Sequence, residues 1–211
     1  GVSNISFGLP QREIINAAFF TMAMEAGEQL KEYGCERPTH IFVQAGVGSL
    51  AGAVVGYFSN LYADNPPVFV VVEAEAAACL YKGAAAGDGQ IRIVDGDMET
   101  IMAGLACGEP NTISWDILKN HVKVFIAAPD WVAATGMRML GAPIKGDAPV
   151  TSGESGAAPF GALAAVMSMD EYADLRKDIG LDENSRVLLF STEGDTDPDR
   201  YKNIVWKGLD K

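Results

Sequence analysis

Two short runs of consecutive apolar residues, each bounded by turn-forming residues, set the tightest limit on how this chain folds. The first run, Ile41 to Val43, leads into a glycine loop, and the second, Val68 to Val72, follows two prolines. Such uninterrupted runs are typical of strands that are buried on both faces of a parallel sheet. A helical pattern from Ser49 to Tyr62 separates them, and parallel neighbours need a crossover of this kind. The sequence therefore predicts an α/β fold with an open, mostly parallel sheet and helices on both faces.

The rest of the chain continues this alternation. Further strands are expected at 91–94, 122–127 and 186–190. Further helices are expected at 13–33, 75–86, 99–107, 114–120, 131–140, 155–169 and 170–179. No repeat, low-complexity tract or convincing linker divides the 211 residues, so residues 1–211 are expected to form a single α/β domain.

The charge balance excludes several classes of partner. Lys and Arg number 16 against 28 Asp and Glu, which gives a formal charge of −12. Nucleic acids and anionic membranes need clustered cations, so neither is expected as the main partner. A small anionic ligand stays possible, because backbone N–H groups hold phosphate even in an acidic protein. The apolar runs are far shorter than the roughly 20 residues of a membrane span, and the first residues lack a secretory signal pattern, so the cytoplasm is expected.

The cysteines and histidines do not form a metal-binding pattern. Cys35, Cys79 and Cys107 lie far apart without a C-x-x-C motif, and the chain has 2 histidines. A structural zinc site is therefore not expected. Free thiols in a reducing compartment are the first interpretation, and a Cys79–Cys107 disulfide is the alternative.

The strongest local signal is the segment GVGSLAG, residues 46–52, between a predicted strand and a predicted helix. Glycines let the backbone approach a ligand closely, and the free N–H groups at a helix start favour a phosphate. The segment lacks the Gly-Lys-Ser/Thr of a Walker loop and departs by one residue from the dinucleotide pattern G-x-G-x-x-G. A nicotinamide site, with Glu73 as the ribose-binding acid, is one alternative. Glycines that merely shape a tight turn are the other.

Two further small-residue segments belong at the same edge of the expected sheet. The first, TSGESGA at 151–157, runs into a predicted helix, and its simplest role is helix capping and close packing. The second, STEGDTD at 191–197, follows the last predicted strand. Ligands of open α/β sheets bind at the carboxyl ends of strands, where these hydroxyl and acidic groups suit a polar ligand. A solvated acidic loop is the alternative for the second segment.

Together with AGLACGEPN at 103–111, these segments resemble one known family. The runs QAGVGSLAG, AGLACGEPN, SGESGA and STEGDTD are similar to those of the diaminopropionate ammonia-lyases. These belong to the tryptophan-synthase-β-like group, fold type II, of pyridoxal 5'-phosphate (PLP) enzymes. The likeness extends from about Thr21 to Trp206, and AGLACGEPN and STEGDTD are its most specific parts. It implies PLP as cofactor, an amino acid as small-molecule substrate, and a homodimer.

The resemblance also implies roles for individual residues. The PLP phosphate is expected to be held by backbone N–H groups, with the Ser49 hydroxyl as a further donor, at Gly46, Val47, Gly48, Ser49 and Leu50. Ser191, or else Thr192, is expected to hydrogen-bond the pyridine nitrogen, and Glu154 to lie near the cofactor. A neutral hydroxyl leaves that nitrogen largely unprotonated, which suits an elimination. The implied reaction is an α,β-elimination that turns 2,3-diaminopropionate into pyruvate and ammonia.

The chain departs from the family in its lysines. The resemblance implies a Schiff-base lysine and acid–base aspartates N-terminal to the glycine loop, in a segment that we expect to lie outside the given sequence. None of the lysines has the family's sequence context, and most have the surroundings of surface groups: Lys31, Lys82, Lys119, Lys123, Lys145, Lys177, Lys202, Lys207 and Lys211.

These departures predict that the chain is the C-terminal part of such a lyase, with no catalytic residue identifiable in it and no activity by itself. Two alternatives stay open. The first is a non-catalytic PLP- or phosphate-binding module. The second is a different fold-type-II lyase, such as a serine or threonine dehydratase.

Overall fold

The sheet has four strands, all parallel, in the order β3-β2-β1-β4. A computed structural model of the chain describes residues 11–209. Each observed strand overlaps a predicted one: β1 His40–Gln44, β2 Val68–Ala74, β3 Val122–Ala128 and β4 Val187–Leu189. The prediction of an open parallel sheet is confirmed.

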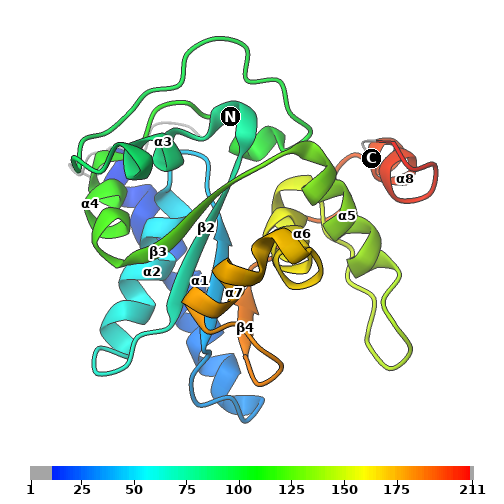
Figure 1. Ribbon diagram of the computed structural model, residues 1–211, viewed down its shortest axis with the longest axis horizontal. Coiled ribbons are helices and arrows are strands. Elements are labelled where there is room, and N and C mark those ends of the chain that lie inside the picture. The colour runs from blue at the N-terminus through cyan, green and yellow to red at the C-terminus, as the bar shows by residue number, and fades with distance from the viewer. Residues whose placement is uncertain (1–10, 210–211) are drawn as a thin grey trace.

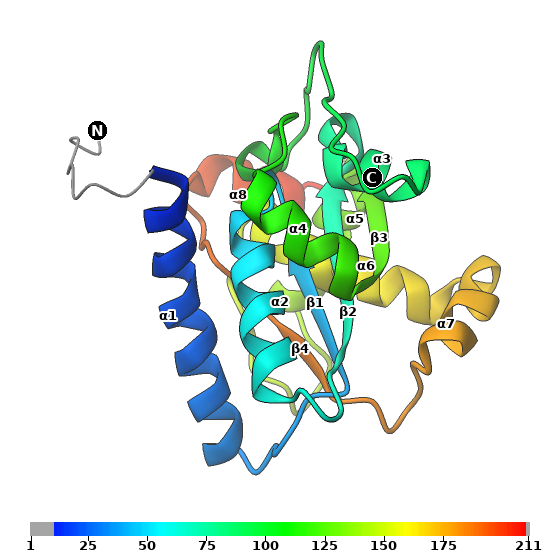
Figure 2. The ribbon, with the colours of Figure 1, turned by 90° about the vertical axis from the view of Figure 1, so that its left-hand side faces the viewer.

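Helices cover both faces of this sheet (Figure 1). One face carries α1 Gln11–Glu32, α2 Ser49–Leu61, α3 Cys79–Ala86 and α4 Thr112–His121. The other carries α5 Asp130–Gly141, α6 Glu154–Ser168, α7 Ala173–Ile179 and α8 Pro198–Val205. Figure 2 shows α1 as the outermost helix of its face, packed along α2. Among these described helices, none combines the length and apolarity that crossing a membrane requires.

The two layers of helices explain the uninterrupted apolar runs. All five residues of β1 are buried, with Phe42 packed in the cluster under α5 and α6 and Val43 in the cluster under α2. Both faces of the strand therefore meet a core. Each fully buried side chain of this size contributes about 1.5–3 kcal/mol to folding, so every position of the run favours an apolar residue.

Two sequence predictions are wrong, and both fall in the same long connection. Residues 91–94 form no strand: Ile91 and Ile93 are 38% and 53% exposed, so this segment lies at the surface and is not part of the sheet. Residues 99–107 form no long helix but only the 3-10 turn Ala103–Leu105, because the Asp130 carboxylate binds the Thr100 hydroxyl and the Ile101 N–H.

Two other differences are smaller. The predicted helix at 75–86 divides into a 3-10 turn, Glu75–Ala77, and α3. Helix α8 was not predicted, although Asp197 followed by Pro198 is a helix-start signal. Its Asp197 side chain accepts a hydrogen bond from the Arg200 N–H.

Candidate functional site

The three small-residue segments meet at one end of the sheet. From β1 the chain proceeds to β2 and β3 on one side, whereas β4 pairs with β1 on the other. The carboxyl ends of β1 and β4 therefore flank the point where the strand order reverses, which is where open α/β sheets bind ligands. A cavity of about 400 Å³ lies there, within the size range of small-molecule sites. It is lined by residues 44–50 together with Gly104, Ser155, Thr192 and Glu193, among others.

The glycine loop forms one wall of the cavity. Gly48 has φ +94° and directly precedes α2, a conformation that favours glycine. A Cβ on Gly46 would lie 3.2 Å from the Gly104 carbonyl oxygen, so glycine there lets the two segments approach. Within the described residues, the backbone N–H groups of 46–50 serve no protein acceptor, as expected for a strand-to-helix turn and the first turn of a helix. This donor set fits a phosphate group.

Asn111, from the segment AGLACGEPN, holds the loop in place. Its backbone N–H donates to the Val47 carbonyl at 2.7 Å, and its side-chain Nδ2 donates to the Ser49 Oγ at 2.9 Å. Its Oδ1 accepts the N–H groups of Ile113 and Ser114 and so caps α4. Because the Ser49 hydroxyl accepts from Asn111, its own hydrogen is available to a ligand.

The segment after β4 forms the opposite wall and is fastened to the start of α6. The Glu193 carboxylate accepts the N–H groups of Ser155 at 2.6 Å and Gly156 at 3.2 Å. Thr192 and Glu193 both line the cavity. Glu193 is an acidic group that the sequence analysis did not select, because only the fold brings it to the α6 N-terminus.

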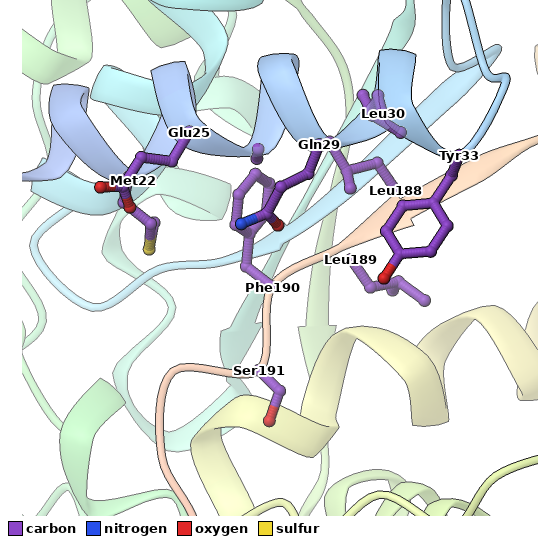
Figure 3. A pocket seen from close by; sticks show the side chains of 10 residues that line it. Met22, Glu25, Gln29, Leu30, Tyr33, Leu188, Leu189, Phe190 and Ser191 are labelled. Carbon is purple, nitrogen blue, oxygen red and sulfur yellow. The ribbon is translucent and has the colours of Figure 1, made fainter.

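The structure gives different surroundings to Ser191 and Thr192, the two residues whose hydroxyls the sequence suggested as partners of the pyridine nitrogen. Thr192 lines the cavity, and its Oγ1 accepts from Gln44 Nε2 at 2.9 Å. Ser191 donates its hydroxyl to the Ser152 Oγ at 2.8 Å. Figure 3 shows the Ser191 side chain pointing from the end of β4 toward α6, beside a second hollow of about 360 Å³ between α1 and β4. Thr192 is therefore the better placed of the two.

Glu154 lies in the first turn of α6, and its carboxylate forms an ion pair with the Arg200 Nε at 3.0 Å. It is not part of the described lining of the cavity, to which its neighbour Ser155 contributes. A role of Glu154 near the cofactor stays a prediction.

Glu73 does not fit a ribose-binding role. Its carboxylate is 1% exposed, and its two oxygens accept the N–H groups of Leu80 and Tyr81 at 2.8 and 2.7 Å. Burial raises the pKa of Glu73 to about 7, and these N–H groups partly oppose that rise. Because both oxygens cap α3, the nicotinamide alternative loses the acid on which it depended.

Lysines and metal-binding groups do not gather at the cavity. Every lysine within residues 11–209 is exposed, and none of the described lining residues is a lysine; Lys211 lies outside the described residues. In the same part of the chain, no group of three or more His, Cys, Asp and Glu side chains is arranged to hold a metal ion. All three cysteines are free thiols, with the Cys79 Sγ lying 3.5 Å from the Cys107 carbonyl oxygen. The structure thus has no Cys79–Cys107 disulfide, and of the three cysteines Cys79 is buried and the other two are half-buried.

A parallel sheet with a glycine loop at its switch point and a hydroxyl lining the same cavity is the arrangement expected of the fold-type-II PLP family. The profile of the family "Pyridoxal-phosphate dependent enzyme" matches residues 6–193, and the chain belongs to this family. Its cofactor is accordingly PLP. Within the family, the chain is a homologue of diaminopropionate ammonia-lyase. It is 52% identical over 195 residues to the enzyme of that name from Salmonella typhimurium, a match that covers 92% of this chain and 48% of the relative.

Solved structures agree with this placement. The Escherichia coli diaminopropionate ammonia-lyase, in complex with an aminoacrylate-PLP azomethine reaction intermediate, matches with a TM-score of 0.83 and 43% identity, over 92% of this chain and 49% of that one. The same enzyme in complex with D-serine matches with a TM-score of 0.81 and 42% identity, over 90% of this chain and 47% of that one. A threonine deaminase, at 21% identity and a TM-score of 0.61 over 74% of this chain and 51% of that one, shares the fold alone. The chain thus spans about half the length of the relatives that it matches.

Proposed function

We propose that this chain forms the part of a diaminopropionate ammonia-lyase that holds the PLP phosphate and the pyridine ring. The reaction proposed for the whole enzyme is the α,β-elimination of 2,3-diaminopropionate, which with one water yields pyruvate and two ammonia. The observation that carries the proposal is the cavity at the carboxyl ends of β1 and β4, which residues 46–50, with their free N–H groups, line together with Thr192. The 52% identity to the Salmonella enzyme supports the choice of substrate.

The roles of the residues follow from their hydrogen bonds. The N–H groups of 46–50 and the Ser49 hydroxyl bind the phosphate, and Asn111 keeps that hydroxyl in place. The Thr192 hydroxyl donates to the ring nitrogen. When bound, PLP supplies the electron-withdrawing ring that stabilises charge at the substrate's α-carbon. Glu193 holds the start of α6 beside the ring.

We further propose that the chain binds PLP without a covalent link and does not release pyruvate by itself. The support is that no lysine is among the described residues that line the cavity. The Schiff-base lysine and the acid–base aspartates would come from polypeptide that corresponds to the other half of the relatives.

Equilibrium dialysis tests the binding part of the proposal. Pyridoxine 5'-phosphate, which has the ring and the phosphate but no aldehyde, avoids reaction with surface lysines. We expect it to bind in competition with inorganic phosphate, and Ser49→Ala to weaken it about ten- to 150-fold through loss of one hydroxyl donor to a charged group. Ser59→Ala, in the same helix and outside the described lining of the cavity, is the matched control. Absence of binding by the wild type would refute the proposal.

Borohydride reduction in the presence of PLP tests the non-covalent part. We expect only scattered labelling of exposed lysines, with no pyruvate formed from diaminopropionate. Stoichiometric labelling of one lysine, or steady release of pyruvate, would show that a lysine of this chain does form the Schiff base with PLP.

The lack of a lining lysine also favours a second candidate function, a non-catalytic PLP-binding module. Co-expression with the N-terminal half of the Salmonella relative separates the two. Pyruvate release from diaminopropionate by the mixture supports the enzyme part, whereas binding of PLP without any turnover supports the module. Serine and threonine are tested as substrates in parallel. Faster turnover of either one than of diaminopropionate would favour the dehydratase alternative.

We also propose a homodimer in the cytoplasm. The exposed hollow between α1 and β4 offers apolar surface to a neighbouring copy, and three free thiols suit a reducing compartment. Light scattering of the purified chain tests the dimer, and a monomer at high concentration would contradict it.

A further inference from the structure

Gln44, the last residue of β1, lies buried beside the cavity with an unusual set of hydrogen bonds. It is 2% exposed, and its Nε2 donates to both the Phe190 carbonyl oxygen and the Thr192 Oγ1, each at 2.9 Å. Its Oε1 has no hydrogen-bond partner among residues 11–209. A buried acceptor without a partner costs free energy that an apolar residue of the same shape would not. The presence of an amide at this position is therefore explained by the two hydrogen bonds that its nitrogen donates and not by a gain in stability.

The orientation of this amide is fixed by the backbone. The Phe190 carbonyl only accepts hydrogen bonds, so the amide must present its NH₂ group to it. The second hydrogen of that NH₂ group then meets Thr192. Thr192 is therefore held as an acceptor on one side, and its own hydrogen has to be donated elsewhere.

The Thr192 side chain is exposed, and the cavity that it lines is one direction in which its hydrogen can be donated. Thr192 lines the cavity, and within residues 11–209 its hydroxyl donates to no protein acceptor. Ser191 next to it differs, because its hydrogen is already donated to Ser152. The structure thus offers one oriented hydroxyl donor, opposite the N–H groups of the glycine loop.

We infer that Gln44 is a positioning residue, whose amide holds the Thr192 hydroxyl as an acceptor and so leaves its hydrogen for a ligand in the cavity that has an unprotonated ring nitrogen. This inference rests on the proposed function, because the ring of bound PLP is the acceptor. Gln44 itself touches neither the phosphate nor the reacting atoms in this assignment. It acts through Thr192.

The test compares two ligands that differ at one atom. Pyridoxine 5'-phosphate has the ring nitrogen, and its 1-deaza analogue has a C–H group in its place. A neutral hydrogen bond corresponds to about three- to tenfold in affinity, so the wild type is expected to prefer the nitrogen ligand by that ratio. Gln44→Met and Thr192→Val are each expected to reduce the ratio toward one, whereas Thr192→Ser and Ser191→Ala keep it. Inorganic phosphate competes equally well in all of these proteins, because the glycine loop is unchanged.

The outcomes separate this inference from the proposed function. If the wild type binds neither ligand, both fail. If it binds both ligands equally, or if Gln44→Met keeps the wild-type ratio, the role of Gln44 is refuted while PLP binding stands. If Gln44→Met does not fold, Gln44→Asn serves instead, since it keeps the amide but its shorter side chain cannot reach Thr192. Loss of the ratio in Ser191→Ala but not in Thr192→Val would overturn the assignment to Thr192.

Discussion

The Glu193 carboxylate accepts the backbone N–H of Ser155 at 2.6 Å, although the two residues are 38 positions apart. A second N–H, from Gly156, meets the same oxygen at 3.2 Å. The loop after β4 therefore caps α6 from outside the helix, in the place that an N-cap side chain usually takes. A negative charge there also interacts favourably with the helix dipole. This contact joins the loop after β4 to the start of α6, and Glu193 and Ser155 both line the cavity.

Replacing Glu193 should consequently affect stability as well as the site. Glu193→Ala leaves two N–H groups of α6 without their acceptor, and we expect a loss of about 0.5–2 kcal/mol in the free energy of unfolding. Denaturant unfolding measures it. Glu183→Ala, at an exposed turn, is the matched control and should change little. Equal stability of the two variants would show that the α6 cap contributes nothing.

The parts of the site that depend on local chemistry were predictable from the sequence. A glycine before a helix start, such as Gly48, and an apolar run that enters it are visible within a dozen residues. The parallel sheet could be expected as well, because helical patterns separate its strands and parallel neighbours need such crossovers. These features require no knowledge of distant contacts.

The parts that depend on distant contacts were not predictable. Gln44 and Thr192 are 148 residues apart, and nothing in either segment indicates that an amide orients a hydroxyl. The helix expected at 99–107 is absent because Asp130, almost 30 positions further on, binds its first residues. Local propensity favours a helix there, and the tertiary contact overrides it.

Gly48 offers a test of backbone conformation at the site. Its φ of +94° strains any other residue by about 1–2 kcal/mol, and a Cβ would lie 3.2 Å from Leu118 Cδ1 and 3.3 Å from Leu80 Cδ1. Gly87→Ala is the control, since Gly87 has φ +69° with nothing within 4 Å of the added Cβ. We expect Gly48→Ala to destabilise the chain more than Gly87→Ala and to weaken phosphate binding, which Gly87→Ala leaves intact. Equal effects in thermal unfolding and dialysis would contradict the crowding argument.

Asn111 combines two roles that substitution can separate. Asn111→Ala removes both the α4 cap and the donor to Ser49, and we expect a loss of about 1 kcal/mol in stability together with weaker phosphate binding. Asn111→Ser keeps a capping oxygen but is too short to hold Ser49. It should recover most of the stability and little of the affinity. Recovery of both properties together would show that capping alone fixes the loop.

The raised pKa of Glu73 predicts that its contribution to the free energy of unfolding depends on pH. Burial, opposed in part by the N–H groups of Leu80 and Tyr81, raises the pKa of Glu73 from 4.5 to about 7 in the folded chain. Between these values the folded state holds a proton that the unfolded state has released, so the Glu73 contribution to stability falls as the pH rises. The neighbouring Cys79 thiol stays neutral in this range, because burial raises its pKa to about 12.

Glu73→Gln removes this titration while keeping a neutral side chain of the same shape. The quantity to follow is the stability difference, that is, the free energy of unfolding of the variant minus that of the wild type. We expect this difference to increase from about pH 4.5 to about pH 7 and to be level above about pH 8. Urea unfolding at a series of pH values measures the difference, in which the titrations of other groups cancel. A flat difference would mean that Glu73 is ionised in the folded chain down to its ordinary range, with the two α3 N–H groups outweighing its burial.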